Sequence, residues 1–206
     1  MDAKTHLTPA HMPVWTLAIC AAALLVFFMP GLGALLVYDR AAIAQGELWR
    51  LVTGNLVHLS VTHLAYDLAA FLIAGTIIEM RGYRHFALLC TSAAMLIGIA
   101  IQGLKPELNF YGGLSGVVTA AITYLCLQGL TEKGTWRWLC AAMLAGLAAK
   151  SWVELVPGKS LLAAVSTEAF VPVPLSHLTG AASAILLFLL IRLSASMGQA
   201  KTAMHP

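Results

Sequence analysis

Long apolar segments alternate with short polar segments along most of this chain. Six apolar segments are close to the length that a membrane-crossing helix needs, which is about 20 residues. They lie at 14–38, 62–80, 85–104, 113–130, 136–152 and 175–193. The first is interrupted by Pro30 and two glycines. The pattern predicts an all-α membrane protein with six transmembrane helices.

The polar segments predict where the helices end. We expect one membrane-embedded domain over 1–206, with a polar N-terminal tail (1–12), a six-helix bundle (14–194) and a polar C-terminal tail (195–206). Residues 39–50 end in Glu47-Leu48-Trp49-Arg50, whose Trp and Arg are typical anchors at the membrane interface. Residues 154–174 contain three prolines and predict a long loop before the last helix.

Composition supports the membrane assignment and excludes other classes. The 206 residues are 60% hydrophobic and 10% charged, and a soluble domain carries more charge on its surface. The net charge of +3 comes without a basic run, so nucleic acid is not an expected partner. The four cysteines stand singly without metal-ligand spacing, and we expect neither metal nor cofactor.

A serine lies between glycines at the start of the fourth segment, in Tyr111-Gly112-Gly113-Leu114-Ser115-Gly116. Small neighbours leave its hydroxyl uncovered, and a helix start offers free backbone N–H groups. This suits a nucleophile whose attack creates an oxyanion. Small residues also occur at helix contacts in membranes, so packing is the alternative interpretation.

The second, fourth and sixth helices run in one direction, so their starts share one face of the membrane. His58, His63 and Asp67 lie at the start of the second helix, Ser115 at the fourth and His177 at the sixth. Ionisable groups inside membranes are costly and usually functional. Ordinary solvation at the interface is the alternative for the histidines.

Chemistry suggests roles for these residues. Ser115 would be the nucleophile, and His177 would take its proton and return it to the leaving amine. No carboxylate near either residue is evident in the sequence, so we expect a dyad. Oxyanion donors would be the Ser115 N–H and groups of the second helix, where His63 and Asp67 share one face.

Small residues four apart would bring the fourth and sixth helices together. They are Gly116 with Ala120, and Gly180 with Ala184. A close approach would permit a hydrogen bond between Ser115 and His177. A proton-coupled transporter that uses the same ionisable residues is the alternative function. The lack of an evident inverted repeat argues against it.

The combined motifs resemble those of the rhomboid intramembrane serine proteases. The motifs are Glu47-Leu48-Trp49-Arg50, His58…His63…Asp67, Gly113-Leu114-Ser115-Gly116 and His177-Leu178-Thr179-Gly180. The resemblance implies a six-helix bundle with a cavity open to the outer side. It also implies cleavage of single-pass transmembrane substrates by Ser115 and His177. His63, Asp67, Gly113 and Leu114 would form the oxyanion and substrate site, with His58, Gly116 and Gly180 in support. A relative that only binds membrane helices is a further alternative.

Two details look more like the rhombosortase branch of that family. They are the Tyr-x-Gly-Leu-Ser-Gly pattern and the Val-Pro-Val-Pro-Leu-Ser-His approach to the last helix. The branch implies removal of C-terminal glycine-glycine membrane anchors from exported bacterial proteins. We therefore expect a bacterial inner-membrane protein with its site toward the periplasm. With six crossings both termini lie on one side of the membrane. That side carries seven Lys and Arg and the other side five, which favours cytoplasmic termini.

Two positions depart from the family pattern. Asp67 stands where the family usually has Asn, and an ionised carboxylate there would repel an oxyanion. We expect it to be protonated or to pair with a cationic His63. Thr119 stands where many members have an aromatic residue packed on the histidine. His177 would then be held less firmly, or be oriented by another group.

Overall fold

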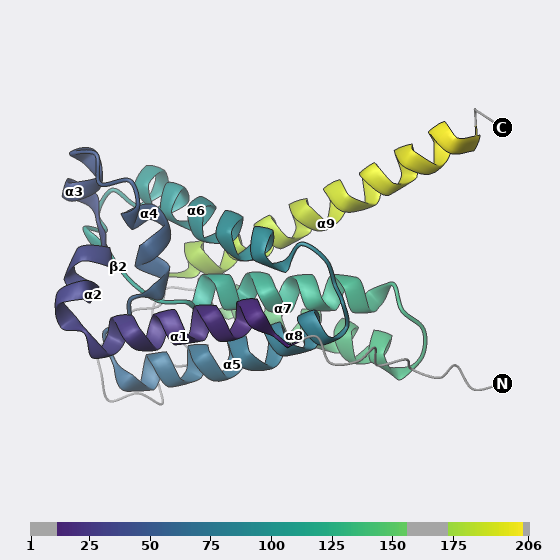
Figure 1. Ribbon diagram of the computed structural model, residues 1–206, viewed down its shortest axis with the longest axis horizontal. Coiled ribbons are helices and arrows are strands. Elements are labelled where there is room, and N and C mark those ends of the chain that lie inside the picture. The colour runs from purple at the N-terminus through teal and green to yellow at the C-terminus, as the bar shows by residue number, and fades with distance from the viewer. Residues whose placement is uncertain (1–11, 156–172, 204–206) are drawn as a thin grey trace.

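A computed structural model of the chain describes residues 12–155 and 173–203. The predicted tail 1–11, most of the predicted loop 154–174, and residues 204–206 lie outside the described residues. The elements in chain order are α1 (Val14–Phe28), α2 (Pro30–Leu36), β1 (Tyr38–Asp39), α3 (Arg40–Ala44), α4 (Arg50–Thr53), the 3-10 helix η1 (Gly54–Leu56), α5 (Val61–Met80), α6 (Phe86–Leu104), β2 (Phe110–Tyr111), α7 (Ser115–Leu130), α8 (Thr135–Leu155) and α9 (Pro174–Ala203) (Figure 1). The all-α prediction is confirmed.

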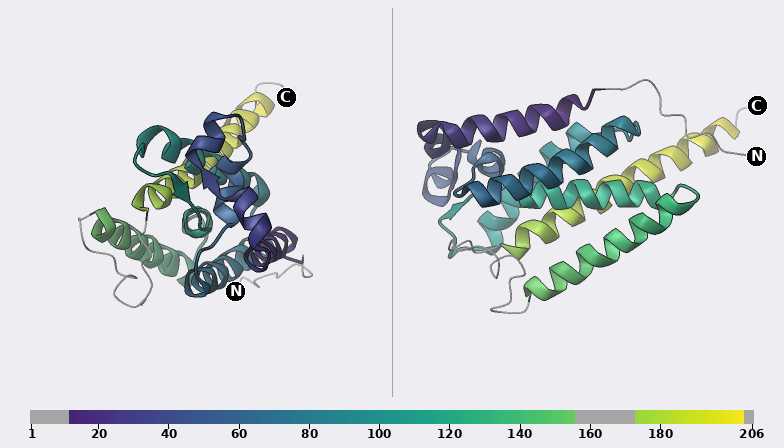
Figure 2. Two further views of the ribbon diagram at one scale, coloured as in Figure 1. Left: turned by 90° about the vertical axis from the view of Figure 1, so that its left-hand side faces the viewer. Right: turned by 90° about the horizontal axis from the view of Figure 1, so that it is seen from below.

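The helix α7 forms the centre of the bundle. It packs against α5, α6, α8 and α9, and side chains all round its surface are buried, among them Val117, Ala121 and Leu125. Figure 2 shows the other helices arranged about it. A helix that is apolar all round is stable only when neighbours cover it on every side. The site described below starts at the first residue of this helix.

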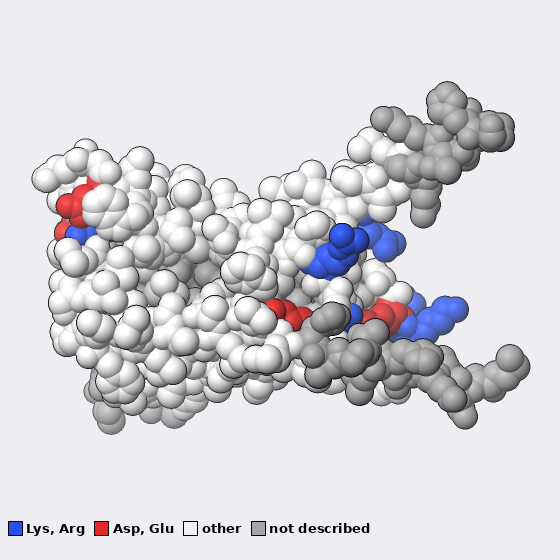
Figure 3. All heavy atoms as spheres, in the orientation of Figure 1, with Lys and Arg blue, Asp and Glu red and all other residues white. Residues whose placement is uncertain are grey.

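Several helices suit a membrane by length and composition. Among the described residues, α5, α6 and the part of α9 from Pro174 to Met197 are long and apolar enough to cross, and α1 with α2 counts as a fourth if the bent pair is one span. The helix α7 is apolar but shorter. On the face drawn in Figure 3, charged side chains gather at the left-hand end and in the right-hand half, with a broad uncharged surface between the two groups. The number of six crossings stays a prediction.

Three predicted boundaries were wrong. The first apolar segment is two helices bent by 112°, because Pro30 starts α2 and the preceding Met29 has non-helical backbone angles. The helix α8 runs to Leu155, so Glu154 belongs to a helix and not to a loop. The helix α9 runs to Ala203 and not only to Leu193, because its polar end contains mostly residues that tolerate a helix.

A layer of short elements covers the end of the bundle where α7 begins. β1 pairs antiparallel with β2, with Tyr38 opposite Tyr111, and this ties α2–α4 to the segment before α7 (Figure 1). Arg50 is buried in this layer, so the prediction that it anchors at the interface was wrong. It donates to Glu47 Oε2 (2.6 Å) and to the carbonyls of Ala34 (3.0 Å) and Val37 (2.8 Å).

The helices α7 and α9 meet through glycine. A Cβ added at Gly180 would overlap the backbone oxygen of Gly116, and one at Gly116 would lie 2.9 Å from the backbone oxygen of Ser176. Small residues permit this backbone-to-backbone approach in membrane helices. The contact sets the distance between the first turns of α7 and α9, which carry Ser115 and His177.

Candidate active site

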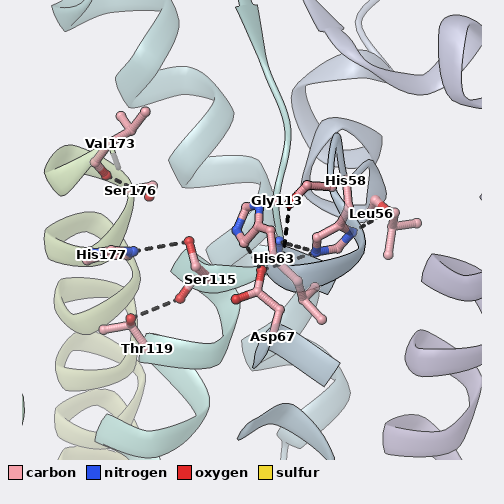
Figure 4. Close-up of polar contacts among 12 residues, drawn as sticks. Leu56, His58, His63, Asp67, Gly113, Ser115, Thr119, Val173, Ser176 and His177 are labelled. Atoms are coloured by element: carbon pink, nitrogen blue, oxygen red, sulfur yellow. Dashed lines mark hydrogen bonds and ion pairs between the residues drawn. The ribbon is translucent and has the colours of Figure 1, made fainter. Parts of the chain in front are cut away.

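Ser115 and His177 face each other across the α7–α9 contact (Figure 4). Ser115 is the first residue of α7, and its Oγ lies 3.0 Å from His177 Nε2 on the first turn of α9. His177 is buried, with 5% of its surface exposed. This distance is that of a hydrogen bond between a hydroxyl donor and an imidazole acceptor. The geometry allows the imidazole to act as a base toward the serine.

A carboxylate contacts the other side of the His177 imidazole, and the sequence pattern did not predict it. Glu154 Oε2 lies 2.8 Å from His177 Nδ1, and Glu154 Oε1 accepts from Lys150 Nζ at 2.7 Å. The Glu154 side chain is 2% exposed. Our expectation that no carboxylate lies near Ser115 or His177 was wrong, because α8 continues through Glu154 and directs it inward.

Two signals in the sequence could have identified Glu154. The fifth helix must end at the face where the second, fourth and sixth begin, so a carboxylate at its end has the depth of the other polar groups. Lys150 also precedes Glu154 by four residues, which is the spacing of an ion pair on one helix face.

Asp67 on α5 has two histidines beside it: His63 on the same helix and His58 in the segment before it. His58 Nε2 and His63 Nε2 each lie 3.1 Å from Asp67 Oδ2. Ser60 caps α5 by accepting from the His63 N–H at 3.2 Å, and this begins the helix that aligns His63 with Asp67. His58 and Asp67 are buried. Asp67, which stands where the resemblance leads one to expect Asn, therefore has two imidazole partners.

The segment before Ser115 lies against this cluster. The Leu114 N–H donates to His58 Nε2 at 3.3 Å, and a Cβ at Gly113 would lie 2.5 Å from His63 Cε1. Gly113 has a φ of +138°, which side chains disfavour. Glycine is thus required both for the backbone conformation and for the approach of His63. This brings the histidine cluster beside the first turn of α7.

A cavity of about 280 Å³ opens beside these groups. Ser115, His177, His63, Asp67 and Glu154 all line it. Its remaining wall is largely apolar or weakly polar and is formed by Ser60, Thr62, Tyr66, Ala70, Val118, Thr119, Ile122, Leu147 and Lys150. The cavity thus joins a nucleophile, a base and polar groups to an apolar surface, which is typical of a ligand site.

The same histidine cluster is also the place where a metal ion could bind. Among the described residues, the ligand atoms of His58, His63 and Asp67 lie within 4.8 Å of one another. Two imidazoles and a carboxylate are a ligand set that Zn²⁺ accepts. His58 Nε2 already lies within hydrogen-bond distance of Leu114 N and Asp67, so the cluster has internal partners without a metal.

Comparison with known proteins gives the family. A family model described as the rhomboid domain matches residues 45–194. The chain is 31% identical over 96 residues to the rhomboid protease GluP of Bacillus subtilis, which covers 46% of this chain and 18% of that protein. It is 30% identical to the rhomboid protease GlpG of an Enterobacter species over 122 residues, covering 56% of this chain and 44% of the relative.

A third relative is the rhomboid protease GlpG of Haemophilus influenzae, at 31% identity over 120 residues. The aligned region covers 55% of this chain and 62% of that protein. The chain thus spans less than two thirds of the length of these relatives. The matched region 45–194 includes the four motifs and every candidate site residue named above. This chain belongs to the rhomboid family.

Proposed function

We propose that this chain is an intramembrane serine endopeptidase, which cleaves peptide bonds in or beside transmembrane segments of membrane-anchored proteins. The observation that carries the proposal is the 3.0 Å contact between Ser115 Oγ and His177 Nε2 in the wall of a cavity within an apolar bundle. The relatives named as rhomboid proteases support it.

The reaction follows the chemistry of acyl transfer. Ser115 Oγ attacks the carbonyl carbon of the scissile bond, and its proton passes to His177 Nε2. The carbon–nitrogen bond then breaks, and His177 returns the proton to the departing amine. Water attacks the resulting ester and gives one proton to His177, and the serine is restored when that proton returns to Oγ. The net change is hydrolysis of one peptide bond.

The first turn of α7 and His63 would stabilise the oxyanion. The first N–H groups of an α-helix have no carbonyl partner within the helix, and Ser115 begins α7. The positive end of the helix dipole lies at the same place. His63 also lines the cavity, and its imidazole, with Nε2 3.1 Å from Asp67 Oδ2, would be a further polar group beside the oxyanion.

We propose that the substrates are single-pass proteins with C-terminal glycine-glycine anchors, in the inner membrane of a bacterium. The Tyr111-to-Gly116 and Val171-to-His177 sequence patterns support this branch. Ser115 and His177 both lie in the first turn of their helices. A scissile bond would therefore be reached at the edge of the membrane, where an anchor begins. The site would face the periplasm, and the termini the cytoplasm.

A serine-directed fluorophosphonate probe tests the proposed chemistry. The purified protein should be labelled at Ser115, and Ser115→Ala should lose labelling and at least about 10³-fold of its cleavage rate. His177→Ala should lose comparable activity. Ser194→Ala is the matched control, because this exposed serine of α9 is not in the cavity wall. Cleavage by Ser115→Ala at the native rate would refute the proposal and favour a non-proteolytic or transport function.

The substrate class needs a separate experiment. We expect cleavage of a single-pass reporter whose anchor begins with two glycines, and a rate at least about tenfold lower when both are replaced by valine. The same reporter with Ser115→Ala gives the background. Equal rates for the two reporters, with Ser115-dependent cleavage of both, would exclude the glycine-glycine preference and leave the protease proposal intact.

A further inference from the structure

We propose that Glu154 is a positioning residue that orients His177 and stabilises its cationic form, so that the site works as a serine–histidine–glutamate triad. This inference rests on the proposed function and deepens it. The observation behind it is the contact of 2.8 Å between Glu154 Oε2 and His177 Nδ1.

The contact determines which nitrogen of His177 carries the proton. An ionised carboxylate only accepts hydrogen bonds, so the proton at this contact must lie on Nδ1. Nε2 is then left with its lone pair, which faces Ser115 Oγ at 3.0 Å. This is the tautomer that a base for the serine requires. Without a partner at Nδ1, the proton could equally lie on Nε2, where it would block the transfer.

Lys150 supports the ionised state of Glu154. The two carboxylate oxygens have separate partners, since Oε1 accepts from Lys150 and Oε2 contacts His177. Lys150 is one turn earlier on α8 and its side chain is 31% exposed, whereas that of Glu154 is 2% exposed. A buried carboxylate is costly without such partners. The pair places a fixed negative charge beside the imidazole, where positive charge develops when Ser115 attacks.

The position of Thr119 gives a second, independent reason to assign the orientation of His177 to Glu154. It lies one turn after Ser115 on α7, and its hydroxyl donates to the Ser115 carbonyl at 2.9 Å. Its small side chain lines the cavity and leaves His177 without an aromatic neighbour at this position. Among the described residues, polar contacts to the His177 ring come from Ser115 and Glu154. The orientation of the imidazole therefore depends on the carboxylate.

Steady-state kinetics of Glu154→Gln test this role. Glutamine keeps the size of the side chain and removes its charge. We expect kcat to fall by about 10²-fold or more, because the imidazolium loses its counter-charge, while KM changes less than about twofold. A role in folding alone would leave kcat per folded molecule unchanged. Glu154→Asp keeps the charge but shortens the side chain by one methylene, so it should recover only part of the lost kcat, about tenfold, and stay at least about fivefold below native. Lys150→Met should lower kcat by a smaller factor than Glu154→Gln does, since the carboxylate of Glu154 remains.

Glu132→Gln is the matched control. Glu132 also forms an ion pair, with Arg81 at 2.7 Å, beyond the other end of α7, and its variant should retain native kcat. A folded Glu154→Gln protein with kcat within about threefold of native would overturn the inference. If Glu154→Gln does not fold, Glu154→Asp decides: kcat at least about fivefold lower at constant KM supports the role, and native kcat refutes it. Cleavage by Ser115→Ala would instead refute the proposed function itself.

Discussion

Gly180 on α9 lies directly against the backbone oxygen of Gly116 on α7, with no room for a side chain between them. This contact controls how far apart the two helices stand where they carry Ser115 and His177. The distance between these two side chains is therefore decided at the residue that follows Ser115 and one turn after His177, by the absence of a methyl group.

The variant Gly180→Ala should separate the two helices. Overpacking a close contact typically costs about 1–3 kcal/mol of stability, and the added methyl group would move His177 away from Ser115. We expect a lower unfolding temperature in detergent, and a loss of cleavage rate per folded molecule that loss of stability alone does not explain. Gly146→Ala on α8 is the control, because nothing lies within 4 Å of an added Cβ there. Native activity in Gly180→Ala would show that the contact does not control the site.

The variant Arg50→Met should destabilise the end of the bundle that supports the site. It would remove hydrogen bonds to the carbonyls of Ala34 and Val37, which lie at and just after the end of α2. Leaving such acceptors unsatisfied costs about 1–3 kcal/mol. The ion pair with Glu47 adds less, since that side chain is 38% exposed.

Thermal unfolding in detergent measures the effect of Arg50→Met. Arg50→Lys should also be less stable than the native protein, because an ammonium cannot reproduce the planar arrangement of donors. Arg192→Met, at an exposed position of α9, is the control and should unfold at the native temperature. If Arg50→Met also unfolds at the native temperature, Arg50 does not stabilise this end of the bundle.

The variant Asp67→Asn should make cleavage less dependent on pH. Asp67 Oδ2 lies 3.1 Å from the Nε2 atoms of both His58 and His63, and this cluster of titratable side chains lies beside the proposed oxyanion site. Asparagine removes one titratable group, but its amide oxygen can still accept a hydrogen bond from an imidazole, so Ser115-dependent cleavage should persist. The measurement is the ratio of rates in mildly acidic and mildly basic buffer. A ratio equal to that of the native protein, or complete loss of cleavage in a folded variant, would contradict this role.

A chelator should leave cleavage unchanged, because every group that the proposed reaction uses is a side chain or a backbone N–H of the protein. The cluster of His58, His63 and Asp67 makes this a meaningful test, since its ligand atoms lie close enough for a metal ion. The experiment compares rates before and after incubation with EDTA. Inhibition that is reversed by added Zn²⁺ would identify the cluster as a metal centre and refute the prediction.

Much of the fold could be predicted because hydrophobic length and helical spacing are local properties. Each of the six apolar segments contains a long helix, and the contact between His63 and Asp67 follows from their spacing of four. The common direction of alternate helices predicted that Ser115 and His177 would share one face, and the structure brings them into contact.

The remaining features depend on how each helix is rotated about its axis and on where it ends, which only packing decides. Glu154 lay beyond the predicted end of its helix, and only the extension of α8 and its rotation direct the carboxylate to His177. Arg50 was expected at the interface, but tertiary contacts bury it beneath α2. The sequence by itself determined where the long helices lie and predicted that the starts of alternate helices share one end of the bundle. The tertiary structure decided which of those groups meet, because a contact between helices depends on neighbours that no single segment specifies.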